Sequence, residues 1–129
     1  MKGSSIRTPR ARVRGLGSAR AGTTHFWHER LTAIALVPLT IAFVVIVVSL
    51  LGRSHATTMQ TLGSPLVAIT MLLFIITGVY HMKLGMQVII EDYVHDEGLK
   101  LTLLIANIFF SIAIGLAALF AILKLSFGV

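Results

Sequence analysis

The run Leu31–Gly52 reads LTAIALVPLTIAFVVIVVSLLG and contains no charged side chain. Two more such stretches follow: residues 54–82 hold no Lys, Arg, Asp or Glu and become apolar near Leu66, and residues 101–123 are uncharged throughout. A helix rises about 1.5 Å per residue, so about twenty apolar residues cross a bilayer core of ~30 Å. Backbone groups in lipid must be paired within their own segment, which favours helices over open strands. The sequence therefore predicts an all-α membrane protein with three transmembrane helices, over about 31–52, 65–91 and 101–123.

The composition of the whole chain agrees with this class. Of its 129 residues 56% are hydrophobic and 12% charged, and the mean hydropathy is +0.90. A soluble domain of this size has too high a surface-to-volume ratio to bury so much apolar surface. The chain has no cysteine, which excludes disulfides, zinc–thiolate sites and iron–sulfur ligation by this chain.

The positive charge is concentrated in a basic N-terminal tail, residues 1–30, which precedes a transmembrane domain at 31–129. The seven basic residues of the tail are Lys2, Arg7, Arg10, Arg12, Arg14, Arg20 and Arg30. A basic tail can bind nucleic acid, but beside membrane spans it more often sets topology or meets anionic lipid and partner proteins, so we expect no nucleic-acid partner. An Arg-rich segment with few acids also describes a mitochondrial transit peptide. We favour an uncleaved tail, because it runs directly into the first span with Trp27 as an interfacial anchor.

The distribution of basic residues between loops predicts the orientation. With the N-terminus inside, the inner flanks hold the seven tail residues together with Lys83 and Lys100, nine in all. The outer flanks then hold two, Arg53 and Lys124. The positive-inside rule therefore predicts an inside N-terminus and an outside C-terminus.

His81 is the ionisable side chain that lies well inside a predicted span. Burying such a group in lipid is costly, so it marks a functional site, although a hydrogen bond that joins two helices is the plain alternative. Gly78 and Gly85 lie at i−3 and i+4, on the same helical face. They would leave a shallow recess suited to a flat macrocycle, and neutral imidazole is a common axial ligand of haem iron. Small residues also allow two helices to approach closely, so both interpretations remain open.

The remaining histidines lie outside the predicted spans, at His25, His28, His55 and His95. None is expected at the depth of His81 on another helix. A six-coordinate haem on His81 with a second histidine ligand would therefore need that histidine from another chain.

Asp92 and Tyr93 follow near the inner edge of the second span. Asp92 comes eleven residues after His81, which is three turns and about 20° of rotation, ~16 Å further along the same face. An acid beside a phenol can hydrogen-bond a quinone carbonyl and deliver protons, although Tyr is also common at membrane interfaces. Arg30, directly before the first span, could pair with a haem propionate or only reach the interface.

The segment HMKLGMQVIIEDYVH at residues 81–95 resembles the second helix of the smaller hydrophobic membrane-anchor subunit of succinate dehydrogenase. LGSARAGTTHFWHERLTAIALVPL at Leu16–Leu39 resembles the start of that subunit's first helix in the alphaproteobacterial and mitochondrial-like branch. The resemblance implies that His81 supplies one axial ligand of haem b. It implies that Tyr93 hydrogen-bonds ubiquinone with Asp92 beside it, and that Arg30 lies near the quinone and haem-propionate region.

The resemblance also implies partners and a location. A companion cytochrome b556-type anchor subunit would supply the other haem ligand and complete a heteromeric helix bundle. An iron–sulfur subunit and a flavoprotein subunit would oxidise succinate and pass electrons to ubiquinone, so this chain would be a non-catalytic anchor of an oxidoreductase. We expect it in the bacterial inner membrane, with the mitochondrial inner membrane as the alternative.

Two other functions remain open from the residues. One is a haem-free or fumarate reductase-type anchor, in which His81 only packs. The other is a small transporter or proton-conducting protein that uses His81 and Asp92 as a relay.

Overall fold

A computed structural model describes residues 8–14 and 21–127, and every regular element in these two ranges is a helix. In chain order these are α1 (Pro9–Arg14), α2 (Ala21–Leu50), α3 (His55–Gly63), α4 (Pro65–Tyr93) and α5 (Glu97–Phe127). Three of them, α2, α4 and α5, are long and apolar enough to cross a membrane. The predicted all-α class with three transmembrane helices is confirmed. The tail residues Lys2, Arg7 and Arg20 lie outside the described ranges.

Helix α2 begins at Ala21, ten residues before the apolar run from which the first span was predicted. Residues 21–30 are more polar than the run that follows, yet they contain no proline, so the helix continues through them. A hydrophobicity pattern detects the part of a helix that can lie in lipid and not the turns that precede it. As a result His25 and His28 lie on α2 and not in an irregular tail.

The loop between the first two spans contains the short helix α3, which the sequence analysis did not predict. Gly52 has a φ of 71° in the turn that follows α2, a backbone conformation that glycine adopts readily. Ser54 then caps α3, because its Oγ accepts a hydrogen bond from the Thr57 N–H at 3.3 Å. Near its end, a Cβ on Gly63 would lie 3.0 Å from the Leu125 carbonyl oxygen, so α3 packs closely on the end of α5.

Helix α4 begins at Pro65, where the second span is predicted to begin, and Ser64 is its N-cap residue. The Ser64 hydroxyl does not cap the helix, however: it donates to the Thr61 carbonyl at 2.7 Å. The helix ends at Tyr93, two residues past the predicted end near 91. Asp92 and Tyr93 therefore belong to the last turn of the helix that carries His81.

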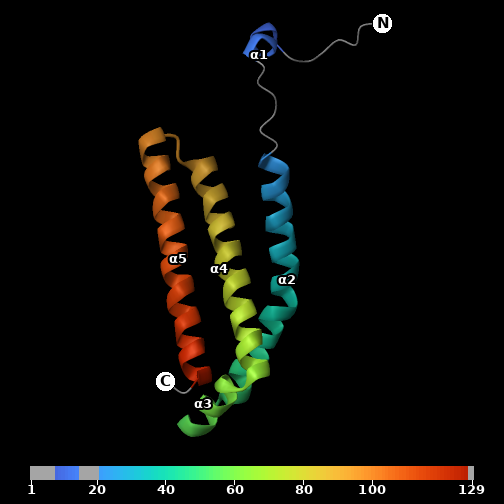
Figure 1. Cartoon of the computed structure of the whole chain (residues 1–129), viewed down its shortest axis with the longest axis vertical. Coiled ribbons are helices and arrows are strands. Elements are labelled where there is room, and N and C mark those ends of the chain that lie inside the picture. Colours follow the sequence, from blue (N-terminus) through green and yellow to red (C-terminus); the bar gives the residue numbers. More distant parts are fainter. Residues whose placement is uncertain (1–7, 15–20, 128–129) are drawn as a thin grey trace, which may run out of the picture.

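Helix α4 lies in the middle of the molecule, with α2 on one side and α5 on the other (Figure 1). On the α2 side the rings of Phe43 and Phe74 stack with centroids 4.6 Å apart. On the α5 side Asn107 donates from Nδ2 to the Lys83 carbonyl oxygen at 2.9 Å, an interhelical hydrogen bond of the kind that joins helices in lipid.

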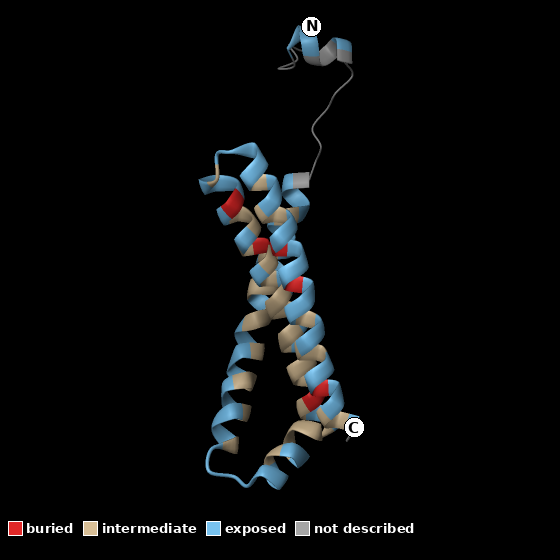
Figure 2. Cartoon of the chain, turned by 90° about the vertical axis from the view of Figure 1, so that its left-hand side faces the viewer, coloured by how far each residue is buried: buried red, intermediate tan, exposed pale blue. Residues whose placement is uncertain are grey.

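Very little of the chain is buried, as Figure 2 shows by the few red segments along the long helices. The buried residues among those described are Ala68, Leu84, Ile90, Asn107, Ser111 and Ile122. A soluble protein could not leave so many large apolar side chains exposed. These faces are therefore suited to lipid and to helices of other chains.

Candidate functional site

The His81 side chain is half-buried between α4 and α2, where it meets Thr32. The distance between the His81 Nδ1 and the Thr32 Oγ1 is 2.9 Å. Thr32 also lies within hydrogen-bond distance of two carbonyl oxygens of its own helix, those of His28 at 2.7 Å and Glu29 at 3.0 Å. The other ring nitrogen of His81, Nε2, has no hydrogen bond from the residues that the structure describes.

The two glycines that flank His81 differ in their surroundings. A Cβ on Gly78 would lie 3.8 Å from the Leu36 side chain, so this glycine faces α2 at ordinary contact distance. A Cβ on Gly85 would have nothing within 4 Å. The predicted recess is therefore open at Gly85, one turn from His81, while the Gly78 side is taken up by helix–helix contact.

A polar cleft of about 430 Å³ lies next to His81, between the start of α2 and the second half of α4. Its lining residues are Thr24, His25, His28, Tyr80, Lys83, Leu84 and Gln87. Within it the Tyr80 hydroxyl and the His28 Nδ1 lie 2.8 Å apart, and the buried His25 Nε2 has no partner in the part of the chain described. The cleft therefore presents two imidazoles, a phenol and an ammonium group close to the half-buried His81.

The polar cleft was not predicted from the sequence, although the sequence contains a signal for it. His25, His28 and Thr32 are spaced by three and then four residues, the spacing that places side chains on one face of a helix. That pattern has meaning only if the helix begins before His25, and the apolar run from Leu31 gave no sign of it.

Tyr93 lines a second cavity, of about 480 Å³, between α4 and α5, here called the Tyr93 groove. Its other lining residues are Met82, Met86, Ile89, Ile90, Val94, Leu103, Ala106, Asn107 and Phe110. The Tyr93 side chain is 77% exposed, so the phenol stands at the mouth of an almost wholly apolar groove. Such a groove can hold an isoprenoid or ring, with one hydroxyl to hydrogen-bond a polar group.

His81 and Tyr93 therefore face different neighbouring helices. Twelve residues separate them, which corresponds to ~18 Å along the helix and about 120° of rotation. His81 contacts α2, whereas Tyr93 lines a groove against α5.

The other two predicted site residues stand apart from these contacts. Asp92 is exposed, and no side chain in the described ranges pairs with it. Arg30 is exposed as well, with its guanidinium carbon 5.2 Å from the centroid of the Phe26 ring, a cation–π contact within α2. No described contact joins Arg30 or Asp92 to His81.

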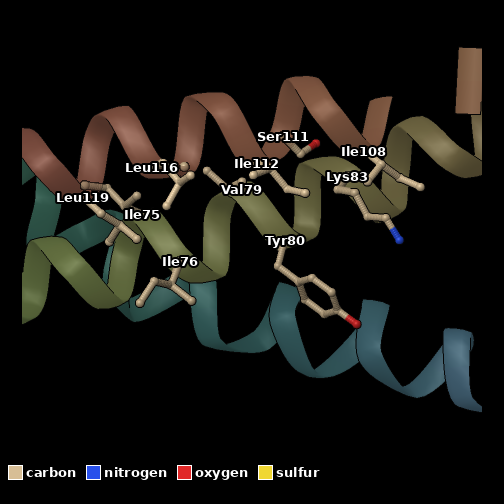
Figure 3. Close-up of a pocket in the computed structure, with 11 residues that line it drawn as sticks. Ile75, Ile76, Val79, Tyr80, Lys83, Ile108, Ser111, Ile112, Leu116 and Leu119 are labelled. Carbon is tan, nitrogen blue, oxygen red and sulfur yellow. The ribbon is translucent and has the colours of Figure 1, made fainter. Parts of the chain in front are cut away.

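A third cavity of about 430 Å³, the Tyr80 groove, also lies between α4 and α5. Figure 3 shows its apolar side chains along both helices, with the polar atoms of Tyr80 and Lys83 towards one end. It has no cluster of acids or histidines, and the described residues hold no group of three or more potential metal ligands anywhere. Among these residues fewer than three such side chains would therefore meet at any metal, and His81 lies well inside a spanning helix.

Comparison with known proteins gives a consistent family. Residues 4–118 match the family model described as succinate dehydrogenase/fumarate reductase transmembrane subunit. A succinate dehydrogenase hydrophobic membrane anchor subunit from Paracoccus denitrificans is 34% identical over 94% of this chain and 93% of its own length. A protein of the same description from Rickettsia bellii is 36% identical over 78% of this chain and 81% of its own. No solved structure matches significantly.

Proposed function

The chain belongs to the succinate dehydrogenase/fumarate reductase transmembrane subunit family, and from that premise we propose its role in detail. It is the D-type hydrophobic anchor of a succinate:ubiquinone oxidoreductase. It supplies one axial ligand of haem b through His81 and part of a ubiquinone site through Tyr93. The curated relatives cited above carry the succinate dehydrogenase name, which favours that enzyme over fumarate reductase.

The observation that carries the haem proposal is the surroundings of His81. Its Nδ1 is engaged by Thr32, its Nε2 has no partner among the described residues, and the helix face at Gly85 is open. A haem-ligating histidine needs this arrangement, since one ring nitrogen binds iron while the other is held by a hydrogen bond. The residues present therefore fit the group. When bound, haem would supply one-electron redox chemistry at this depth in the membrane.

The polar cleft supports the same proposal. The carboxylates of haem are anionic and need cationic or hydrogen-bonding partners when they are withdrawn from water. Lys83 and the two histidines of the cleft offer such groups beside His81. They are better placed for this role than Arg30, which contacts Phe26.

The Tyr93 groove is the best candidate for this chain's share of the ubiquinone site. Its apolar walls suit the quinone ring and the first part of the isoprenoid tail, and the exposed phenol can donate a hydrogen bond to a quinone carbonyl. Asp92, in the same last turn, is exposed and could receive protons from water for transfer towards the site. The predicted orientation would place this end of α4 on the inner side, where the iron–sulfur subunit docks.

The exposed apolar faces support a heteromeric bundle. Helices α2 and α5 contact α4 and leave most of their own surface uncovered. A companion anchor subunit packed on these faces would contribute the second haem ligand. The flavoprotein and iron–sulfur subunits complete the proposed complex, in the bacterial inner membrane or its mitochondrial counterpart.

The test is the spectrum of the complex purified through a tag on this chain. We expect a flavoprotein, an iron–sulfur protein and a second anchor to co-purify, with the optical and EPR signals of a low-spin b-type haem. His81→Ala should abolish or alter those signals. His95→Ala is the matched control, because His95 is exposed in the loop after α4.

Three results would contradict the proposal. An unchanged haem spectrum in the His81→Ala complex removes the ligand role. A complex that has quinone reductase activity but no b-type absorption would show that the chain is a haem-free anchor. Purification of this chain as a homo-oligomer, without soluble partners, favours the transporter instead.

A further inference from the structure

The Thr32 hydroxyl joins α2 to the His81 ring. Because the hydroxyl has a single proton, its other contacts bear on which of the two groups donates this hydrogen bond. Three hydrogen-bonding atoms surround the Oγ1: the His28 carbonyl oxygen at 2.7 Å, the Glu29 carbonyl oxygen at 3.0 Å and the His81 Nδ1 at 2.9 Å. A hydroxyl has one proton to donate and two lone pairs with which to accept. Carbonyl oxygens can only accept, so Thr32 is the donor in both of these contacts, in the back-bonding geometry common for threonine in helices.

While Thr32 donates to the carbonyls of its own helix, the contact with His81 runs in the other direction. With its own proton directed at the His28 carbonyl, the Thr32 oxygen presents a lone pair to the imidazole. In this arrangement the His81 Nδ1 carries the proton and donates it to Thr32. In a neutral imidazole only one nitrogen is protonated, which leaves the lone pair on Nε2 free.

We propose that Thr32 is a positioning residue, which fixes His81 in the Nδ1–H tautomer and fixes the plane of its ring. This inference rests on the proposed function, since it concerns how His81 is prepared for iron. The opposite tautomer would place a proton on Nε2, where the ligand lone pair must be. In that tautomer the lone pairs of Nδ1 and the Thr32 oxygen would also repel each other, unless the hydroxyl stopped donating to its carbonyl partners and donated to Nδ1.

The surroundings of the pair make the contact effective. His81 is half-buried between two helices of a membrane protein, where water is scarce and an interhelical hydrogen bond has few competitors. Residues that hydrogen-bond the second nitrogen of a metal-bound histidine orient the ring and raise its basicity, and their loss typically weakens metal affinity about 10–100-fold. Thr32 is the side chain that does so here among the residues described.

The experiment compares three variants in the full complex purified through this chain. Thr32→Val keeps the branched shape and removes the hydroxyl, whereas Thr32→Ser keeps the hydroxyl. His81→Ala reports on the ligand role itself. The readouts are the ratio of haem to protein, the haem lost on dilution in detergent, and the g-values of the oxidised low-spin haem by EPR.

We expect Thr32→Val to lose haem on dilution about 10–100-fold more readily and to shift the g-values, and Thr32→Ser to restore both. Unchanged retention and g-values in Thr32→Val overturn the inference. Equal losses in the Val and Ser variants overturn it as well, because the contact would then be one of packing. If Thr32→Val does not assemble with its partners, Thr32→Ala, which also lacks the hydroxyl, is measured by the same criteria.

The His81→Ala variant separates the two proposals. Loss of the haem signal in His81→Ala together with an unaffected Thr32→Val keeps the haem ligand and rejects the positioning role. Retention of the haem signal in His81→Ala rejects both.

Discussion

At the scale of single residues, His81 is supported from α2, a helix 49 positions away in sequence at the point of contact. The face of α2 that meets it carries His25, His28 and Thr32 in successive turns. Polar side chains inside a membrane protein are costly unless they find partners, and most of these find them across the α2–α4 interface. The interface is therefore a polar region within an apolar bundle, which is where a charged cofactor can be accommodated.

Removing the phenol of Tyr93 should affect quinone and leave succinate oxidation intact. In Tyr93→Phe the ring remains at the mouth of its groove and one hydrogen bond to ubiquinone is lost. The loss costs about 1 kcal/mol, or roughly a fivefold rise in KM for ubiquinone. Electron transfer from succinate to an artificial soluble acceptor serves as the control and should not change. Equal losses of both activities would indicate failed assembly and not a quinone contact.

The open recess at Gly85 gives a second prediction about one residue. A Cβ at this position would have nothing within 4 Å, so we expect Gly85→Leu to insert and fold normally. Where a macrocycle or partner helix occupies the recess, the added volume costs about 1–3 kcal/mol, and haem retention should fall by about tenfold. Gly85→Ala should show a smaller loss. Full haem retention in Gly85→Leu would mean that the recess is not used.

At the scale of elements, the α4–α5 interface contains two buried polar side chains, of which one is hydrogen-bonded and the other is not. Asn107 donates to the Lys83 carbonyl, whereas the Ser111 hydroxyl has no partner in the described structure. The two residues are four positions apart, about one helix turn, on the face of α5 that meets α4. They offer a matched pair of substitutions.

Asn107→Leu should weaken the packing of α5 on α4 by about 0.6 kcal/mol, and by no more than ~1.7 kcal/mol, the range measured for interhelical hydrogen bonds in lipid. Ser111→Ala should be neutral or slightly stabilising, since it removes a hydroxyl that makes no bond. Unfolding of the full chain in mixed micelles, followed by circular dichroism, measures both. A larger loss for Ser111→Ala than for Asn107→Leu would contradict this account.

At the scale of the whole molecule, α2 and α5 pack on two sides of α4, and the three helices form an open arrangement and not a closed bundle (Figure 1). A helix in lipid gains little from burying apolar surface against another helix, so close packing and polar contacts decide which faces meet. The faces left open here belong to α2 and α5. An anchor that shares a cofactor with a second subunit needs such faces.

The predicted orientation can be tested by cysteine labelling. The chain has no cysteine of its own, so any label on it reports on the introduced residue. Ala56→Cys, in exposed α3, should react with a membrane-impermeant maleimide added to intact cells. His95→Cys, in the exposed loop between α4 and α5, should react only after the membrane is permeabilised. The reverse pattern would place the N-terminus outside, against the positive-inside rule.

The sequence by itself determined the number of spans, their approximate limits and the residue at which chemistry is expected. These follow from local properties: the length of an uncharged run and the cost of an ionisable group in lipid. The resemblance carried by residues 81–95 indicated the family, which the comparisons then confirmed.

Only the tertiary structure decided which helix each polar side chain meets. The partner of His81 is Thr32, the partner of Tyr80 is His28, and Tyr93 faces α5. An apolar run fixes a helix in depth but not in rotation or neighbour, because lipid and a second helix are almost equally apolar. The contacts that choose between them are single hydrogen bonds between residues about fifty positions apart, which no local pattern contains.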